Sequence, residues 1–191
     1  MVQELLLETP AFLGRILSDI QSVTKYMNAG IVIALVYVVV YYLMILLFRL
    51  LKIKYNHKRS HVLSVFLLLV YTTAIFYIVF MSREVGEYSG ANLRLFSSWG
   101  KTNTTHAYFV ENIIMFVPMG ILLPCSYGRF RKVYKCVLTC LLISLVIEII
   151  QYIFGIGIAE IDDVLNNTIG GFIGWCIWRV CAVCYKNLTQ K

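Results

Sequence analysis

The chain has 191 residues, of which 60% are hydrophobic and only 14% are charged. A soluble domain of this length carries roughly a quarter charged residues, so the composition excludes an ordinary soluble protein and predicts a membrane protein. The formal net charge of +7 is compatible with nucleic-acid binding. The basic residues lie between apolar runs, however, where they orient membrane segments, and we therefore expect no nucleic-acid partner.

The N-terminal segment, residues 1–27, precedes the first long apolar run. Its apolar side chains fall on one broad helical stripe, with Glu8, Arg15 and Asp19 interspersed. It lacks the basic start and the cleavage site of a signal peptide. We assign it as an amphipathic segment in the membrane interface, and the alternative is a short helix packed on the bundle.

Five apolar segments are long enough to cross a membrane as helices, which rise 1.5 Å per residue. The first two resemble plain lipid anchors, the third is short and broken by Pro118, and the last two carry polar residues. The segments are residues 30–48, 62–81, 110–126, 133–154 and 168–185. The sequence therefore predicts an all-α membrane helical bundle, with two anchor helices in residues 28–89 and a membrane domain in residues 90–186.

The charges of the connecting loops predict an orientation. Lysine and arginine concentrate in the first and third loops. The fourth loop holds Glu160, Asp162 and Asp163, and it contains no lysine or arginine. By the positive-inside rule the basic loops are cytoplasmic and the acidic loop faces out. Five spans then place the N-terminus outside and the C-terminus in the cytoplasm. The outer loop, residues 82–109, is expected to be an ordinary surface loop, with a lid as the alternative.

The six cysteines all map to the cytoplasmic half of the predicted spans or to its edge. This side of a membrane is kept reduced, so we expect no disulfides. Cys181 and Cys184 have the spacing of a CxxC motif, but no second metal-binding pair accompanies them. We interpret them as small apolar side chains in a helix rather than as a zinc or redox site.

Glu148 lies in the middle of the fourth apolar run. An ionised carboxylate is costly there, so its presence indicates that it either pairs with another group or has a function. The helical rise places it about 9 Å below the outer boundary, at the depth that polar residues of the third and fifth segments also reach. Ser144, Gln151 and Tyr152 are expected on the same helical face. The candidate binding residues are Glu111, Asn112, Glu148, Gln151, Asp162, Asp163, Asn166 and Asn167.

Small residues indicate how these segments approach one another. Gly170 and Gly174 form a GxxxG pattern, which lets two backbones come close in lipid. Pro118 removes an amide donor, and we expect a kink that opens a cavity towards the outside. A structural interpretation of the polar residues stays open, in which Glu148 is neutral, the aspartates complement a helix N-terminus and the asparagines join helices.

Three motifs in this order resemble the VanZ-like family: an Asn–Phe–Pro–Gly run, a Glu–Gln pair and an Asp–Val–Asn–Thr–Gly block. The resemblance covers about residues 90–178. Many family members carry an arginine before the last block, where this chain has Gly155 and Gly157, and this departure argues against a fixed cation in the site. The corresponding positions are Asn112, Phe116, Pro118, Gly120, Glu148, Gln151, Asp163, Asn167, Thr168 and Gly170.

The resemblance implies a multi-pass protein of the bacterial cell membrane that lowers susceptibility to lipoglycopeptides such as teicoplanin. Its outward acidic and amide-rich pocket would engage a lipid-tailed antibiotic or a lipid-linked cell-wall precursor, with membrane lipid as a further partner. Phe116, Pro118, Gly120, Thr168, Gly170 and Gly174 would have structural roles.

Two other functions remain as alternatives. In an intramembrane enzyme acting on a lipid-linked substrate, Glu148 and Asp163 would serve as acid and base, or acidic side chains would hold a divalent cation. The outer face offers neither a Ser–His nor a Cys–His pair, so the enzyme is the less favoured interpretation and we expect no cofactor. A proton-coupled transporter comes last, because the five spans contain no inverted repeat.

Overall fold

The computed structural model describes residues 27–51, 59–81, 86, 90–97 and 103–189. Five helices in these ranges are long and apolar enough to cross a membrane, which confirms the predicted all-α helical membrane bundle. They are Met27–Leu50, Ser60–Met81, His106–Ser126, Val133–Phe154 and Ile161–Thr189. Almost all of the predicted amphipathic segment lies outside the described residues.

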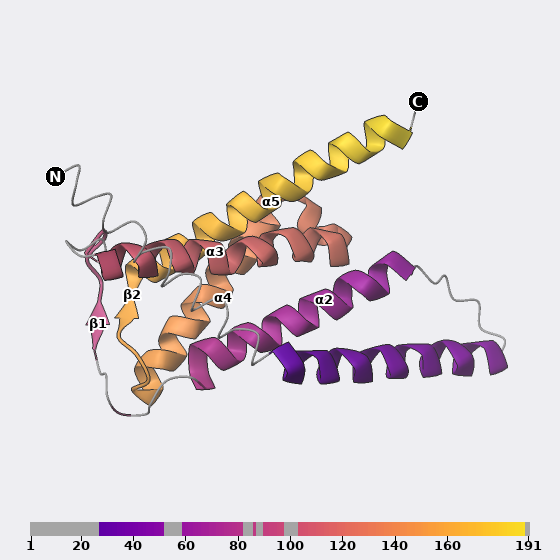
Figure 1. Ribbon diagram of the computed structural model, residues 1–191, viewed down its shortest axis with the longest axis horizontal. Coiled ribbons are helices and arrows are strands. Elements are labelled where there is room, and N and C mark those ends of the chain that lie inside the picture. The colour runs from indigo at the N-terminus through magenta and orange to yellow at the C-terminus, as the bar shows by residue number, and fades with distance from the viewer. Residues whose placement is uncertain (1–26, 52–58, 82–85, 87–89, 98–102, 190–191) are drawn as a thin grey trace.

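Four α-helices, α2 to α5, follow the helix Met27–Leu50 along the chain, and two short strands lie between them (Figure 1). The π-helical turn η1 continues α2, and the 3₁₀ turn η2 joins α3 to α4. The bounds are α2 Arg59–Phe76, η1 Tyr77–Met81, β1 Ala91–Asn92, α3 Asn103–Ser126, η2 Gly128–Arg131, α4 Val133–Phe154, β2 Ala159–Glu160 and α5 Ile161–Thr189. β1 and β2 pair in parallel, with Ala91 opposite Ala159.

Two helices are longer than the sequence indicated. The prediction that the third segment is short and broken at Pro118 was wrong, because α3 spans 24 residues and continues through Pro118 and Pro124. α5 begins at Ile161, before the apolar run of residues 168–185, and Asp162 and Asp163 occupy its first turn, at the helix N-terminus where the sequence placed them. Carboxylates are favourable at that end of a helix, and a search for apolar runs alone misses such a polar first turn.

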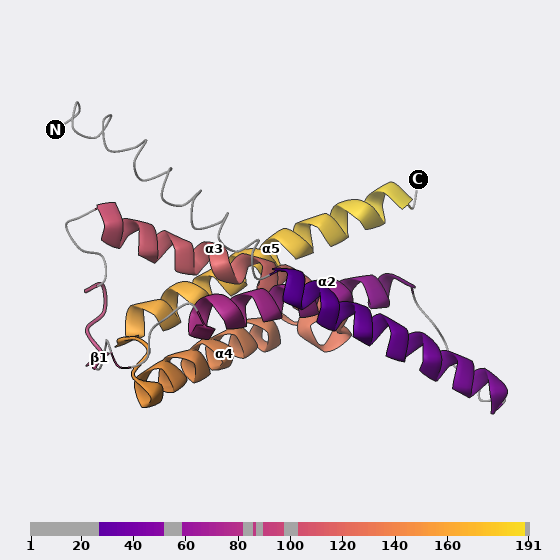
Figure 2. The ribbon, with the colours of Figure 1, turned by 60° about the horizontal axis from the view of Figure 1, so that its bottom comes forward.

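α5 lies between α3 and α4 (Figure 2). Glycines let α3 and α5 approach closely: a Cβ atom on Gly170 would overlap the carbonyl oxygen of Ile113, and one on Gly174 would overlap that of Val117. On the facing helix, a Cβ on Gly120 would overlap the carbonyl oxygen of Gly171. The expected close backbone contact at the GxxxG pattern is therefore confirmed.

The apolar core lies where α2, α3 and α4 meet. Its centre includes Phe116, Cys136 and Cys140, which are fully buried. The hydroxyl of Tyr71 donates a hydrogen bond from α2 to the carbonyl oxygen of Met115 on α3. The six cysteines are free thiols, two of them inside this core, where they pack as small apolar side chains.

The helix Met27–Leu50 contacts the bundle closely at Gly30, where a Cβ atom would overlap the carbonyl oxygen of Val70 on α2. Most of its other large apolar side chains are exposed, and it lies beside α2 in Figure 1. In a spanning helix such side chains face lipid, as expected for an anchor.

The two ends of the bundle differ in charge. Exposed basic side chains of η2 and early α4, including Arg129, Arg131 and Lys135, lie at one end of α4. The acidic β2–α5 junction lies at the other end of the same helix. By the positive-inside rule, this separation of charge predicts that the basic end is cytoplasmic. The orientation of the bundle across the membrane stays a prediction.

Candidate functional site

Buried polar side chains gather around the first turns of α5. Six of them come from the facing turns of α4 and α5, and burial of such groups is costly unless they are hydrogen-bonded. They are Ser144, Glu148, Gln151, Asp162, Asn166 and Asn167. Three further members of the predicted binding set are half-buried. They are Glu111 and Asn112 in α3 and Asp163 in the first turn of α5.

Asp163 and Asn112 join α5 to α3. The side-chain amide of Asn112 donates to Oδ1 of Asp163 at 2.6 Å. A hydrogen bond to a charged acceptor is stronger than one between neutral groups. Two residues from different predicted motifs are thus in direct contact.

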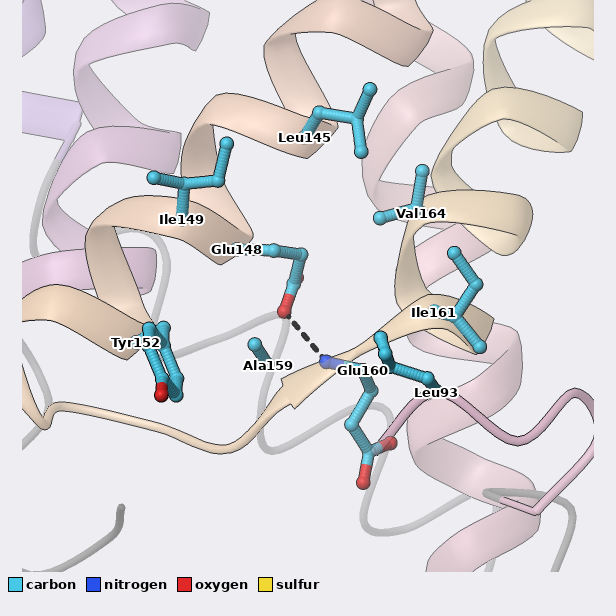
Figure 3. A pocket seen from close by; sticks show the side chains of 9 residues that line it. All are labelled: Leu93, Leu145, Glu148, Ile149, Tyr152, Ala159, Glu160, Ile161 and Val164. Atoms are coloured by element: carbon cyan, nitrogen blue, oxygen red, sulfur yellow. Dashed lines mark hydrogen bonds between the residues drawn. The ribbon is translucent and has the colours of Figure 1, made fainter. Parts of the chain in front are cut away.

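Glu148 joins α4 to β2. Its side chain is only 6% exposed, and its Oε2 accepts a hydrogen bond from the backbone N–H of Glu160 at 3.0 Å (Figure 3). This contact is possible because Gly155 ends α4 with a φ of 61°, in the left-handed region that glycine adopts without strain. The chain then turns back, so that β2 passes beside the helix it has just left.

Asp162 anchors the segment that precedes α3. Its side chain is fully buried, and its Oδ1 accepts from the backbone N–H of Phe96 at 2.6 Å. Phe96 has a φ of 59°, which is uncommon for a bulky residue. The backbone N–H of Ala159 also donates to the carbonyl of Gly90 at 3.0 Å. Residues 90–97 are therefore held against the α4–α5 connection, and the predicted loop is shorter than expected because α3 already begins at Asn103. Residues 82–85, 87–89 and 98–102 of that loop lie outside the described residues.

Two amides connect α4 with its neighbours. The Nδ2 of Asn167 donates to the hydroxyl of Ser144 at 2.8 Å. The Nε2 of Gln151 donates to the carbonyl of Val79 in η1 at 3.4 Å. The expectation that Tyr152 shares this face was wrong, since it is 56% exposed. At 3.6 residues per turn it lies about 80° around the helix from Ser144, which turns it towards the surroundings.

Asn166 differs from the other buried amides. It is fully buried, yet neither its Oδ1 nor its Nδ2 has a hydrogen-bond partner among the described residues. It stands one turn before Gly170, on the face of α5 that packs closely on α3. An amide without partners in such a place is rare in native proteins and requires an explanation.

A pocket of about 200 Å³ lies between α4 and α5. Its walls are almost entirely apolar, and Glu148 is the one member of the predicted binding set that lines it (Figure 3). It is lined by Leu93, Leu145, Glu148, Ile149, Tyr152, Ala159, Glu160, Ile161 and Val164. The structure thus joins Asn112 to Asp163 and Asn167 to Ser144, and it places one residue of the predicted binding set, Glu148, at the edge of an apolar pocket. Sequence reasoning missed the pocket walls, because leucine and valine carry no signal in a chain that is apolar on every face.

The remaining predicted residues have structural surroundings. Phe116 is fully buried in the core, and Gly120, Gly170 and Gly174 form the α3–α5 contact. The hydroxyl of Thr168 donates to the carbonyl of Val164 within α5 at 2.7 Å. Within the part of the chain that the structure describes, no three His, Cys, Asp or Glu side chains are grouped to hold a metal ion.

The spanning helices and the polar residues buried between them define a polytopic membrane protein with an intramembrane polar cluster. The model of the VanZ/LLP1 family matches residues 33–182, so the chain belongs to this family. This match also covers the two anchor helices, which the resemblance by motif did not reach, because their lipid-facing residues are interchangeable.

One curated relative is protein VanZ of Enterococcus faecium. The two chains are 38% identical over 82 residues, which are 43% of this chain and 48% of the relative. The match therefore spans about half the length of that protein. No solved structure matches the chain.

Proposed function

We propose that this chain lowers the susceptibility of a bacterial cell to lipoglycopeptides such as teicoplanin. In this proposal an outward-facing acidic and amide-rich site engages a lipid-tailed molecule, either the antibiotic itself or a lipid-linked cell-wall precursor. Membership of the VanZ/LLP1 family and the similarity to protein VanZ support the link to resistance.

The observation that carries the proposal is the position of Glu148. Its buried carboxylate stands at the boundary between the polar cluster and an apolar pocket. A lipid-tailed molecule has the same two parts, a polar head and a hydrocarbon chain. Such a site would bind the head by hydrogen bonds and the chain by exclusion of lipid, which explains why a costly carboxylate is kept in the membrane.

Two substitutions test this function, Glu148→Gln and Asp163→Asn. Each keeps the shape of the side chain and removes its charge, and losing a charged hydrogen bond costs about 1.5–3 kcal/mol. We therefore expect each variant to lose about tenfold or more in affinity for the ligand, and hence to lose protection against teicoplanin. The measurement is the minimal inhibitory concentration in cells whose membranes contain equal amounts of each variant.

Glu8→Gln is the matched control, because Glu8 lies outside the region that the family match covers. A glycopeptide without a lipid tail serves as the second control, and we expect its potency to be the same in all strains. Unchanged teicoplanin susceptibility in both Glu148→Gln and Asp163→Asn would contradict the proposed function.

A further inference from the structure

The pocket between α4 and α5 is bordered on one side by residues that face the membrane. Ile149 and Tyr152 of α4 are more than half exposed, at 54% and 56%. Val164 of α5 closes the opposite wall, and it is buried. Exposed apolar side chains on a spanning helix contact lipid, so hydrocarbon is the medium at the edge of this pocket.

The other end of the pocket is bordered by residues 90–97. Leu93 lines the pocket and lies near Ile161 in Figure 3. Its segment is fixed by the pairing of β1 with β2 and by the hydrogen bond from Phe96 to Asp162. A molecule therefore reaches the pocket more directly from the membrane side than past this segment.

The volume of the pocket limits what can occupy it. Sites for whole drug-sized molecules measure about 300–1,000 Å³, and this one has about 200 Å³. A slightly smaller apolar cavity, about 150 Å³, stays dry and accepts benzene. The pocket thus suits a stretch of hydrocarbon chain and excludes the bulky polar core of a glycopeptide.

Carboxylate charge beside the apolar pocket selects the group that the chain is attached to. The lining residues comprise two glutamates, Glu148 and Glu160, and, of the residues described, neither lysine nor arginine. Figure 3 shows the carboxylate of Glu160 pointing away from that of Glu148, whose Oε2 accepts from the backbone N–H of Glu160. A phosphate ester is repelled here, whereas an amide N–H or a hydroxyl can donate to a carboxylate.

We infer that this pocket takes up one hydrocarbon chain whose polar junction is a neutral hydrogen-bond donor, as in a fatty-acyl amide. The inference rests on the proposed function and selects between its two ligands. It favours the acyl chain of a lipid-tailed antibiotic over a precursor that is joined to its lipid through phosphate. The chain enters from the membrane and lies against Leu145 and Val164, and its amide lies next to Glu148.

The test uses the full chain in nanodiscs of neutral phospholipid and two photoreactive probes that share one chain. The probes are N-dodecanoylethanolamine and dodecyl phosphate, each with a diazirine in the chain, and labelled residues are mapped by mass spectrometry. We expect saturable labelling of the pocket walls by the amide, reduced by an excess of unlabelled amide. The phosphate should label these walls about tenfold less, which corresponds to about 1.4 kcal/mol.

Leu145→Trp fills the pocket, and Leu142→Trp is its control, because Leu142 is exposed on the same helix and does not line the pocket. We expect the first to abolish specific labelling and the second to leave it intact. In a Glu148→Gln, Glu160→Gln double variant, the phosphate probe should label as well as the amide. Labelling of wild-type protein that excess amide does not reduce would overturn the inference, even if Leu145→Trp fails to fold. Equal labelling of wild-type protein by both probes would also overturn it.

The labelling and the susceptibility assay separate the two proposals. Specific labelling in a protein whose Glu148→Gln and Asp163→Asn variants protect normally supports the pocket and contradicts the proposed function. Absent labelling, together with lost protection in those variants, keeps the proposed function and overturns the acyl-chain pocket.

Discussion

Asn166 and Asn167 are adjacent in the chain and equally deeply buried, but they differ in their partners. Asn167 donates to Ser144 through Nδ2 and lacks a partner at Oδ1, whereas both polar atoms of the Asn166 side chain are without hydrogen-bond partners in the described part of the chain. A buried polar group without a partner costs about 1–3 kcal/mol. A protein retains such a cost most readily where it serves a function.

This difference predicts opposite effects of the same substitution. Asn166→Leu removes two unsatisfied polar atoms and should raise the unfolding temperature or leave it unchanged. Asn167→Leu removes the hydrogen bond to Ser144 and leaves that hydroxyl buried, so it should lower stability by about 1–3 kcal/mol. Thermal denaturation of the purified variants in one detergent measures both. Greater destabilisation by Asn166→Leu than by Asn167→Leu would show that Asn166 has partners of its own.

Two substitutions of Glu148 separate the effect of its charge from the effect of its hydrogen-bond acceptor. Glu148→Gln keeps an oxygen for the N–H of Glu160, so its stability should stay within about 1 kcal/mol of the wild type. Glu148→Leu leaves that N–H without its acceptor and should cost about 1–3 kcal/mol. Chemical denaturation of the two variants tests this prediction. Equal stability of the two would mean that the bond from Glu160 contributes nothing.

At the scale of elements, the contact between α3 and α5 depends on glycines rather than on polar bonds. The facing carbonyl oxygens of Ile113 and Val117 occupy the places that Cβ atoms on Gly170 and Gly174 would take. The backbone cannot yield as a flexible side chain can, so even one added methyl group must separate the helices. The Asn112–Asp163 bond joins the same two helices and shifts with them.

Gly174→Ala should therefore destabilise the protein by about 1–3 kcal/mol, the usual cost of overpacking. Gly128→Ala is the matched control, since a Cβ atom there meets nothing within 4 Å. Unfolding temperatures in detergent report the difference. A Gly174→Ala variant as stable as Gly128→Ala would rule out the tight packing of α5 on α3.

At the scale of the whole molecule, composition was sufficient to predict the spanning helices, because hydrocarbon admits few polar residues in a long helix. The same cost singled out Glu148 and Asp163 before any contact was known. The pairing of Asn112 with Asp163 was beyond prediction, since it depends on how α5 lies along α3. The pocket walls, such as Leu145, depend on packing in the same way.

The direction of the bundle across the membrane follows from its charged ends and gives the last prediction. If the basic η2 end is cytoplasmic, the exposed thiols Cys181 and Cys184 near the end of α5 lie on that side, and Arg94 lies outside. A membrane-impermeant maleimide should then label an Arg94→Cys variant on intact cells beyond the level of the wild type. The native thiols should react only after the membrane is permeabilised. Labelling of the native thiols on intact cells, without added labelling of Arg94→Cys, would reverse the orientation and place the Glu148 site at the cytoplasmic side, where an antibiotic arriving from outside does not first meet it.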